Sequence, residues 1–208
     1  TGDTTQSIII DTTGNYQVEV CDLASNTTSV IYSEDFEGVI GNEWNSNITY
    51  SYNSTLSLGR FNNDTISLNL SNLPCHDSIT VEFDLYLHES WDGNGIPICC
   101  GPDIINLRAD GIDMMRATFS NTNQLQSYPD DYLVNNPQWT GASLTGSYSM
   151  YKISKTIYHT NTNALVDFIG SGLQSIQDER WAFSNVKIYT IRDSCCATED
   201  INVQIKCP

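Results

Sequence analysis

The stretch Ile79–Phe119 constrains the fold of this chain more than any other part. Between Ile79 and Leu87, an apolar side chain at every second position alternates with a polar one. A period of two is typical of a β-strand with one face on a core. The strand cannot continue through Asp92-Gly93-Asn94-Gly95, because Asp-Gly and Asn-Gly pairs favour the positive φ angles of tight turns. The stretch therefore predicts a strand, a sharp turn and then a second strand around Ile104–Leu107.

Polar and aromatic side chains gather where these two predicted strands meet. Trp91 and Asp92 follow the first strand, Asn94 lies in the turn, and Asp103 directly precedes the second strand. The adjacent Cys99 and Cys100 lie between the turn and Asp103. This cluster is the best candidate for a functional site.

Charge and hydropathy exclude several classes of partner. The chain has 208 residues, 9 Lys and Arg against 25 Asp and Glu, and a net charge of −16. Such a balance disfavours nucleic acid and anionic membranes as partners. No apolar run approaches the roughly 20 residues that cross a bilayer, so we expect no membrane insertion. No segment resembles a signal peptide, so we expect a mature chain or one cut from something larger. The acidity itself fits either solubility outside the cell or cation binding.

The cysteines favour an oxidising compartment and hence an extracellular or cell-surface location. There are seven: Cys21, Cys75, Cys99, Cys100, Cys195, Cys196 and Cys207. Two adjacent pairs do not have the spacing of zinc ligands, so disulfides are the better interpretation. Adjacent cysteines point apart, so each should reach a different partner. We expect bridges among the five central cysteines, and a Cys21–Cys207 bridge within or between chains; an odd count leaves one thiol over.

The two ends of the chain read like parts of one unit. Residues 1–30 contain two short β runs, Ser7–Ile10 and Tyr16–Val20, around a turn. The segment TGDTTQSIIIDTTGNYQVEVCD resembles the last two strands of immunoglobulin-like repeats in surface and gliding-associated proteins of Bacteroidota-type bacteria. In residues 193–208, the tail Ala197–Pro208 alternates like a strand and resembles the opening strand of such a repeat. The ends pair with each other, or each completes a neighbour's unit and builds a fibre by strand donation.

The central domain, residues 31–192, reads as a two-sheet sandwich. Short β runs separated by Gly, Asn, Asp and Pro turns show no helical period. They are Leu56–Phe61, Thr65–Leu70, Ile79–Leu87, Ile104–Leu107, Met114–Phe119, Tyr148–Ile157, Ala164–Ile169 and Ala182–Thr190. The opening EDFEG with Trp44, and the closing DERWAFSNV, resemble the first and last strands of jelly-roll modules of the galactose-binding, carbohydrate-binding and MAM types. The fold class implied is all-β, a jelly-roll β-sandwich with terminal immunoglobulin-like strands, as found in secreted bacterial proteins. Ser184 stands where such modules commonly have Asp.

Calcium is the strongest chemical hypothesis. This ion takes six to eight hard oxygens from carboxylates, amide side chains and loop carbonyls. We predict as ligands Asp92, Asn94, Asp103, Asp178, Glu179 and Glu37. In the modules that the chain resembles, the first and last strands are neighbours, which would bring the acids of the two strands together. The alternative is that Asp-Gly and Asn-Gly are turn residues only and that the acids are solvated.

Glycan binding needs exposed aromatic rings beside hydrogen-bonding side chains, because a sugar offers an apolar face and a ring of hydroxyls. Aromatic residues on predicted loops are Trp91, Tyr128, Tyr132 and Trp139. The alternative is that Trp91 and Trp139 cover the ends of the core.

Catalysis has little support, since no motif of a nucleophile elbow or zinc protease occurs and the three histidines stand apart. His88 is expected on the surface.

The protein as glycan acceptor is also predicted. Candidate acceptor sites are Asn26, Asn47, Asn53, Asn63, Asn69, Thr65 and Ser78.

These observations predict a non-catalytic extracellular adhesion or binding module, stabilised by calcium and directed at a glycan or cell-surface polysaccharide. The alternative is a structural subunit of an extracellular filament, which self-associates through its terminal strands.

Overall fold

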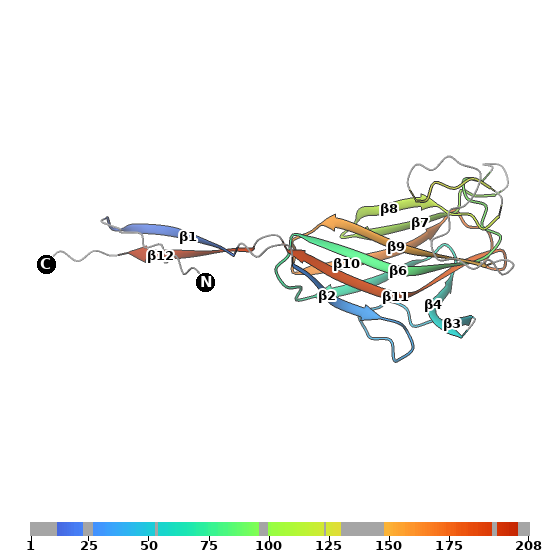
Figure 1. The fold of residues 1–208 in the computed structure, drawn as a ribbon, viewed down its shortest axis with the longest axis horizontal. Helices are drawn as coiled ribbons and strands as arrows, with labels where there is room; N and C mark the ends of the chain where they lie inside the picture. Colours follow the sequence, from blue (N-terminus) through green and yellow to red (C-terminus); the bar gives the residue numbers. More distant parts are fainter. Residues whose placement is uncertain are drawn as a thin grey trace.

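A computed structural model describes residues 12–22, 27–52, 54–95, 100–122, 124–129, 148–192 and 195–203. All regular secondary structure in these ranges is β-strand. Two antiparallel sheets pack face to face, and a separate pair of strands extends from one end of them (Figure 1). The predicted fold class, an all-β jelly-roll sandwich, is confirmed.

The smaller sheet has four strands in the order β5-β10-β7-β8. They are β5 (Thr65–Ser71), β10 (Asn163–Ser171), β7 (Ile104–Ala109) and β8 (Ile112–Thr118). The β7–β8 turn is made by Asp110 and Gly111, whose φ angles of 49° and 79° suit a short polar side chain and a glycine.

The larger sheet has six strands, five of them in the order β3-β4-β11-β6-β9. They are β2 (Thr27–Glu34), β3 (Thr49–Tyr52), β4 (Thr55–Phe61), β6 (Ser78–Glu89), β9 (Tyr148–Tyr158) and β11 (Glu179–Arg192). Along one edge of β11, β4 pairs with Trp181–Phe183 and β2 with Val186–Arg192. The expected neighbourhood of the opening and closing strands is therefore present.

Between the two sheets lies an aromatic core. Phe168 of β10 stacks on Phe183 of β11 with ring centroids 4.5 Å apart, and Phe83 of β6 meets Phe168 edge-on at 5.0 Å. Each such ring, fully buried, stabilises the fold by about 2 kcal/mol. The odd-numbered residues of β6 face this core, as the alternation predicted, and its even-numbered residues face away from it.

Each of the eight predicted strands overlaps an observed one, β3 was not predicted, and the opening strand, which the resemblance implied at Glu34–Gly38, is observed earlier in the chain as β2. β3 has only four residues, too few to show a period. β2 begins at Thr27, before the expected boundary at residue 31, and its first four residues are all exposed, so no alternation marks its start.

The ends of the described chain pair with each other. Strand β1 (Gly14–Asp22) runs antiparallel to β12 (Cys195–Val203) as a two-stranded ribbon that projects from the sandwich (Figure 1). Of the two options left open by the sequence, the structure has the pairing within one chain. The predicted partner run, Ser7–Ile10, lies outside the described residues. The immunoglobulin-like assignment stays a prediction.

Among the cysteines that the structure describes, Cys75 and Cys100 are each disulfide-bonded. Cys99 and Cys207 lie outside the described residues, so the Cys21–Cys207 bridge stays a prediction. The backbone register places Cys21 opposite Cys196. Within the described ranges, no helix is long and apolar enough to cross a bilayer.

Candidate functional site

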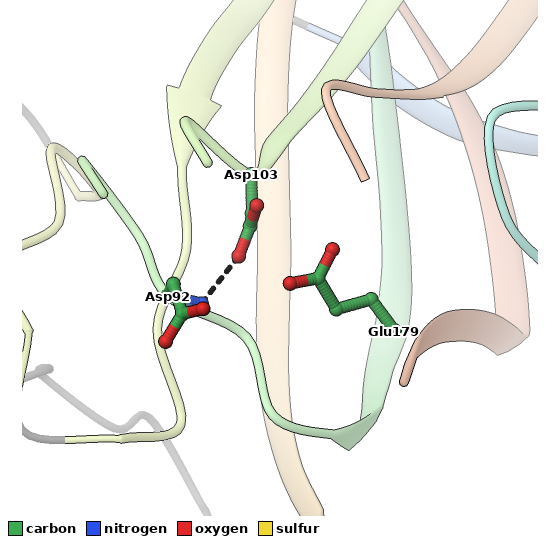
Figure 2. Close-up of side chains that lie close together, drawn as sticks. All are labelled: Asp92, Asp103 and Glu179. Carbon is green, nitrogen blue, oxygen red and sulfur yellow. Dashed lines mark hydrogen bonds between the residues drawn. The ribbon is translucent and has the colours of Figure 1, made fainter. Parts of the chain in front are cut away.

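Three carboxylates converge at one end of the sandwich (Figure 2). Asp92, Asp103 and Glu179 each place a side-chain oxygen within 4.8 Å of the other two. Asp92 follows the end of β6, Asp103 directly precedes β7, and Glu179 begins β11. Because β7 belongs to the smaller sheet and the other two strands to the larger one, the carboxylate cluster joins the two sheets.

The glycine-rich turn after β6 sets the position of two of these residues. Gly93 has a φ of 64°, and a Cβ atom there would lie 2.2 Å from the carbonyl oxygen of Leu125. The Asn94 amide donates to that same carbonyl at 2.7 Å, and the Asp103 amide donates to the Gly93 carbonyl at 2.8 Å. Only glycine permits this close approach, which holds Asp92 and Asp103 face to face.

Two oxygens of the carboxylate cluster lack a hydrogen bond. One oxygen of Asp103 accepts from the Asp92 amide, and Oε2 of Glu179 accepts from the Gln174 amide. Asp103 Oδ1 and Glu179 Oε1 have no hydrogen-bond partner among the described residues, and both side chains are 0% exposed. A buried polar atom without a partner costs about 1–3 kcal/mol, and more when it is charged.

The electrostatics show the same deficit of positive charge. Burial, followed by the charges of neighbouring acids, raises the pKa of Glu179 to about 7. Burial likewise raises the pKa of Asp103 to about 6, despite the backbone amides that stabilise its charged form. Burial and the Asp178 carboxylate raise the pKa of Asp92 as well. The carboxylate cluster therefore favours any partner that supplies positive charge, either protons or a metal ion.

Of the six predicted metal ligands, the structure brings together three. Asn94 Oδ1 accepts from Thr118 Oγ1, and Asp178 Oδ1 accepts from Ser90 Oγ, so both lie beside the carboxylate cluster without joining it. The prediction that Glu37 joins the site is wrong. The register of β2 on β11 pairs Glu34 with Val186, and Glu37 binds the Leu56 amide instead.

The predicted glycan-binding aromatics are not an exposed shelf. Trp91 is 0% exposed and donates its Nε1–H to the Arg180 carbonyl, and Tyr128 is buried and stacks on Phe119. The binding prediction is therefore wrong for Trp91 and Tyr128, which cover the end of the core. Tyr132 and Trp139 lie outside the described residues.

An unpredicted cluster of rings lies on the face of the larger sheet that points away from the core. The aromatic strip, as we name it, consists of Tyr50, Tyr86, His88 and Tyr148. His88 touches Tyr50 and Tyr148 with centroid distances of 5.5 Å each, and Tyr86 stacks on Tyr148 at 6.1 Å. His88 is buried, contrary to its expected surface position. The signal in the sequence was the set of even-numbered residues on β6, which place Tyr86 and His88 on one face.

A second buried polar cluster lies at the other end of β6. His76 Nε2 lies 2.7 Å from His159 Nδ1, and His159 Nε2 lies 3.1 Å from Asp110 Oδ2. His76 Nδ1 contacts the Pro74 carbonyl at 2.5 Å. This histidine chain joins the segment before β6, the end of β9 and the β7–β8 turn. Sequence reasoning missed it, since the two histidines are separated by 83 positions.

The glycan-acceptor sites stay predictions. Asn47, Asn69 and Thr65 are exposed, and Ser78 is half-buried. Asn63 is exposed, but its side chain also bonds both backbone groups of Leu173. Asn26 and Asn53 lie outside the described residues.

Comparison with known proteins identifies no family. No family model matches the chain, and no curated protein matches it. Solved structures that match include dimeric latent PorU from Porphyromonas gingivalis, with a TM-score of 0.48 over 82% of this chain and 13% of that one. A GH115 4-O-methyl-alpha-glucuronidase matches with a TM-score of 0.40 over 78% and 18%, and the sugar-binding EclA C-terminal domain with 0.35 over 90% and 86%. Each is 12% identical. The chain thus spans a small part of the first two proteins, and no functional argument rests on these likenesses.

Proposed function

We propose that this chain is a calcium-stabilised, non-catalytic binding module of a secreted or cell-surface protein. The observation that carries the proposal is the carboxylate cluster, in which two oxygens of fully buried side chains have no hydrogen-bond partner in the described part of the chain. A cation there would offset the buried negative charge and connect the two sheets.

Calcium fits this cluster better than the other common hard cation. Each of the three carboxylates offers at least one oxygen, and loop carbonyls and waters can complete the six to eight oxygens that calcium takes. Magnesium retains several waters and demands octahedral geometry, which a buried cluster contributed by three separate elements supplies poorly.

Calorimetric titration of the metal-stripped chain with calcium tests the proposal. We expect binding of one calcium ion per chain, with much weaker binding of magnesium. Glu179→Gln should weaken calcium binding at least tenfold, yet should stabilise the metal-free protein at neutral pH because it removes a buried charge. Glu37→Gln is the matched control and should leave binding unchanged. Calcium binding that survives Glu179→Gln would contradict the proposal.

A glycan is the proposed ligand of the module. Support comes from the outer face of the larger sheet, where the aromatic strip borders charged and amide side chains. The non-catalytic assignment is supported by the burial of Asp103 and Glu179, both 0% exposed, which keeps these carboxylates from a substrate. A panel of polysaccharides incubated with the protein should release no shorter products.

A filament subunit is the second candidate function, favoured by one feature. Among the described residues, the β1–β12 ribbon has two strands, and an isolated two-stranded ribbon is marginally stable in water. Pairing with a neighbour's strand would stabilise it. The mass of the native protein, measured by light scattering with and without calcium, separates the two functions. A monomer favours the binding module, and a ladder of oligomers the filament.

A further inference from the structure

The aromatic strip crosses four strands of the larger sheet, and two small residues lie on the strands between its ends. Tyr50 is on β3 and His88 on β6, with β4 and β11 between them. The register places Ser57 of β4 opposite Tyr50, and Arg180 of β11 opposite His88. Gly59 and Ala182, also on the two intervening strands, are paired with each other, and Ala182 is opposite Tyr86. A Cβ on Gly59 would lie 2.5 Å from the Ala182 Cβ, so no larger side chain fits at this point of the sheet.

On one side of the strip is a hollow of about 340 Å³. Its polar lining consists of Glu82, Asp84, Lys152, Ser154, Asn185 and Lys187. A bulge in β11 between Ser184 and Lys187 creates it and gives Asn185 a φ of 53°. Asn185 donates to Asp84 at 2.8 Å, which orients the amide and carboxylate groups in the hollow.

On the other side of the strip is a second hollow of about 270 Å³. Tyr50, Arg60, Gln177 and Arg180 contribute to its lining. The Arg60 guanidinium lies 4.1 Å above the Tyr50 ring, and Arg180 pairs with Glu89. These contacts hold both guanidinium groups on the outer face of the sheet.

The two hollows lie on either side of the strip on the outer face of the larger sheet, and we name the three together the path. Glu82 borders the first hollow, and His88 is in the strip beside the second. These residues are six positions apart on one strand, a distance of about 20 Å. A ligand that uses both hollows must be an extended chain rather than a single sugar.

The charge of this path differs from that of the chain. Arg60, Lys152, Arg180 and Lys187 contribute four of the nine Lys and Arg residues of the sequence. The carboxylates beside them are Glu82, Asp84 and Glu89. The path is thus slightly cationic in a chain of net charge −16. Burial, followed by the charges of Arg60 and Arg180, lowers the pKa of His88 to about 4, so its buried ring adds no positive charge to the path.

We propose that this outer face binds an extended acidic glycan, with sugar rings on the aromatic strip and acid groups on the four cations. The inference rests on the proposed glycan-binding function and names its site and ligand class. Stacking on half-exposed Tyr50 and Tyr148 suits the apolar face of a sugar ring. The hydroxyl and amide groups of the first hollow suit its hydroxyls, and the cations select uronate or sulfate groups.

A glycan array carrying uronate-containing, sulfated and neutral polysaccharides tests the proposal with the full chain in calcium. We expect signals on the acidic glycans that fall with rising salt. Calorimetry with hyaluronan oligosaccharides should show affinity that grows with chain length, because glucuronate alone cannot reach both hollows. The Lys152→Glu, Lys187→Glu double variant should weaken binding at least tenfold. Arg116→Glu, an exposed charge reversal on the other sheet, is the matched control and should change nothing.

The outcomes separate failure of this inference from failure of the proposed function. Binding of neutral glycans only would overturn the acidic ligand class while leaving a glycan-binding module. Binding of acidic glycans that is unaffected by the double variant and by Arg60→Ala would overturn the site. Absence of binding to every glycan would overturn both the inference and the ligand of the proposed function.

Discussion

The two ends of β6 bury ionisable groups in opposite ways. At one end, the carboxylate cluster of Asp92, Asp103 and Glu179 leaves two oxygens without a hydrogen-bond partner among the described residues. At the other, about 40 Å away, the histidine chain of His76 and His159 uses every ring nitrogen. The histidine chain is therefore complete by itself, whereas the carboxylate cluster requires a charge from outside the chain.

Counting protons sharpens this contrast. Three hydrogen bonds link the Pro74 carbonyl, the two imidazoles and Asp110, and each bond needs one proton. Two neutral imidazoles supply only two. Burial would raise the pKa of Asp110, but hydrogen bonds from the Leu165 amide, Asn161 and His159 outweigh it and lower that pKa. We therefore expect the third proton on the histidine pair, balanced by the Asp110 carboxylate. The histidine chain thus carries its own counter-charge, whereas the carboxylate cluster lacks one.

The largest expected effect is that of calcium on the carboxylate cluster. Calcium at a thousandfold excess over its Kd should raise the free energy of unfolding by about 4 kcal/mol, because it binds the native state alone. Urea denaturation with calcium and with a chelator measures this. An unfolding midpoint that the chelator leaves unchanged would show that the carboxylate cluster, like the histidine chain, needs no charge from outside the chain.

The next largest effect is loss of the histidine chain. His159→Phe should destabilise the protein by about 3 kcal/mol, since it leaves Nε2 of the buried His76 without its hydrogen bond and removes one of the hydrogen bonds of Asp110. The cost should be equal with and without calcium, because the two clusters are distant and share no partners. Nitrogen-detected NMR of the two imidazoles in the unmodified protein should show three protonated ring nitrogens. A cost below about 0.5 kcal/mol, a level typical of surface substitutions, would contradict this account.

A third effect is the pH dependence of the metal-free protein. The pKa of Glu179 rises from 4.5 to about 7 and that of Asp103 from 3.8 to about 6 on folding. A raised carboxyl pKa stabilises the folded state at low pH, and this stabilisation is lost as pH rises through the folded value. The free energy of unfolding should therefore fall by at least about 1 kcal/mol between pH 4 and pH 8. Saturating calcium should remove this fall. Thermal melts across the same pH range measure it, and a melting temperature that still falls with pH in saturating calcium would mean that calcium binds elsewhere.

The smallest expected effect is that of the acid beside the carboxylate cluster. Asp178 raises the pKa of Asp92 and Glu179 by its charge without joining the group. Asp178→Asn should weaken calcium affinity only about threefold, the scale of a half-screened charge pair. A loss as large as that of Glu179→Gln, measured by the same titration, would make Asp178 a ligand.

Much of the fold followed from local sequence patterns. Alternation placed the eight strands from Leu56 to Thr190, and the Asp-Gly and Asn-Gly pairs placed the turn after β6. Three of the carboxyl groups singled out, those of Asp92, Asp103 and Glu179, do meet. These features depend on a residue and its near neighbours, which is what periodicity and turn chemistry report.

Only the tertiary structure decided which distant residues meet. The register of β2 on β11 keeps Glu37 from the carboxylate cluster, and the packing of the sheet ends buries Trp91, for which the sequence had left a sugar-binding role and a place in the core both open. His76 and His159 come together from two strand ends, and Tyr50 meets His88 although two strands lie between theirs. Such contacts depend on strand order and register, which are set by the packing of the whole core and leave no local period in the chain.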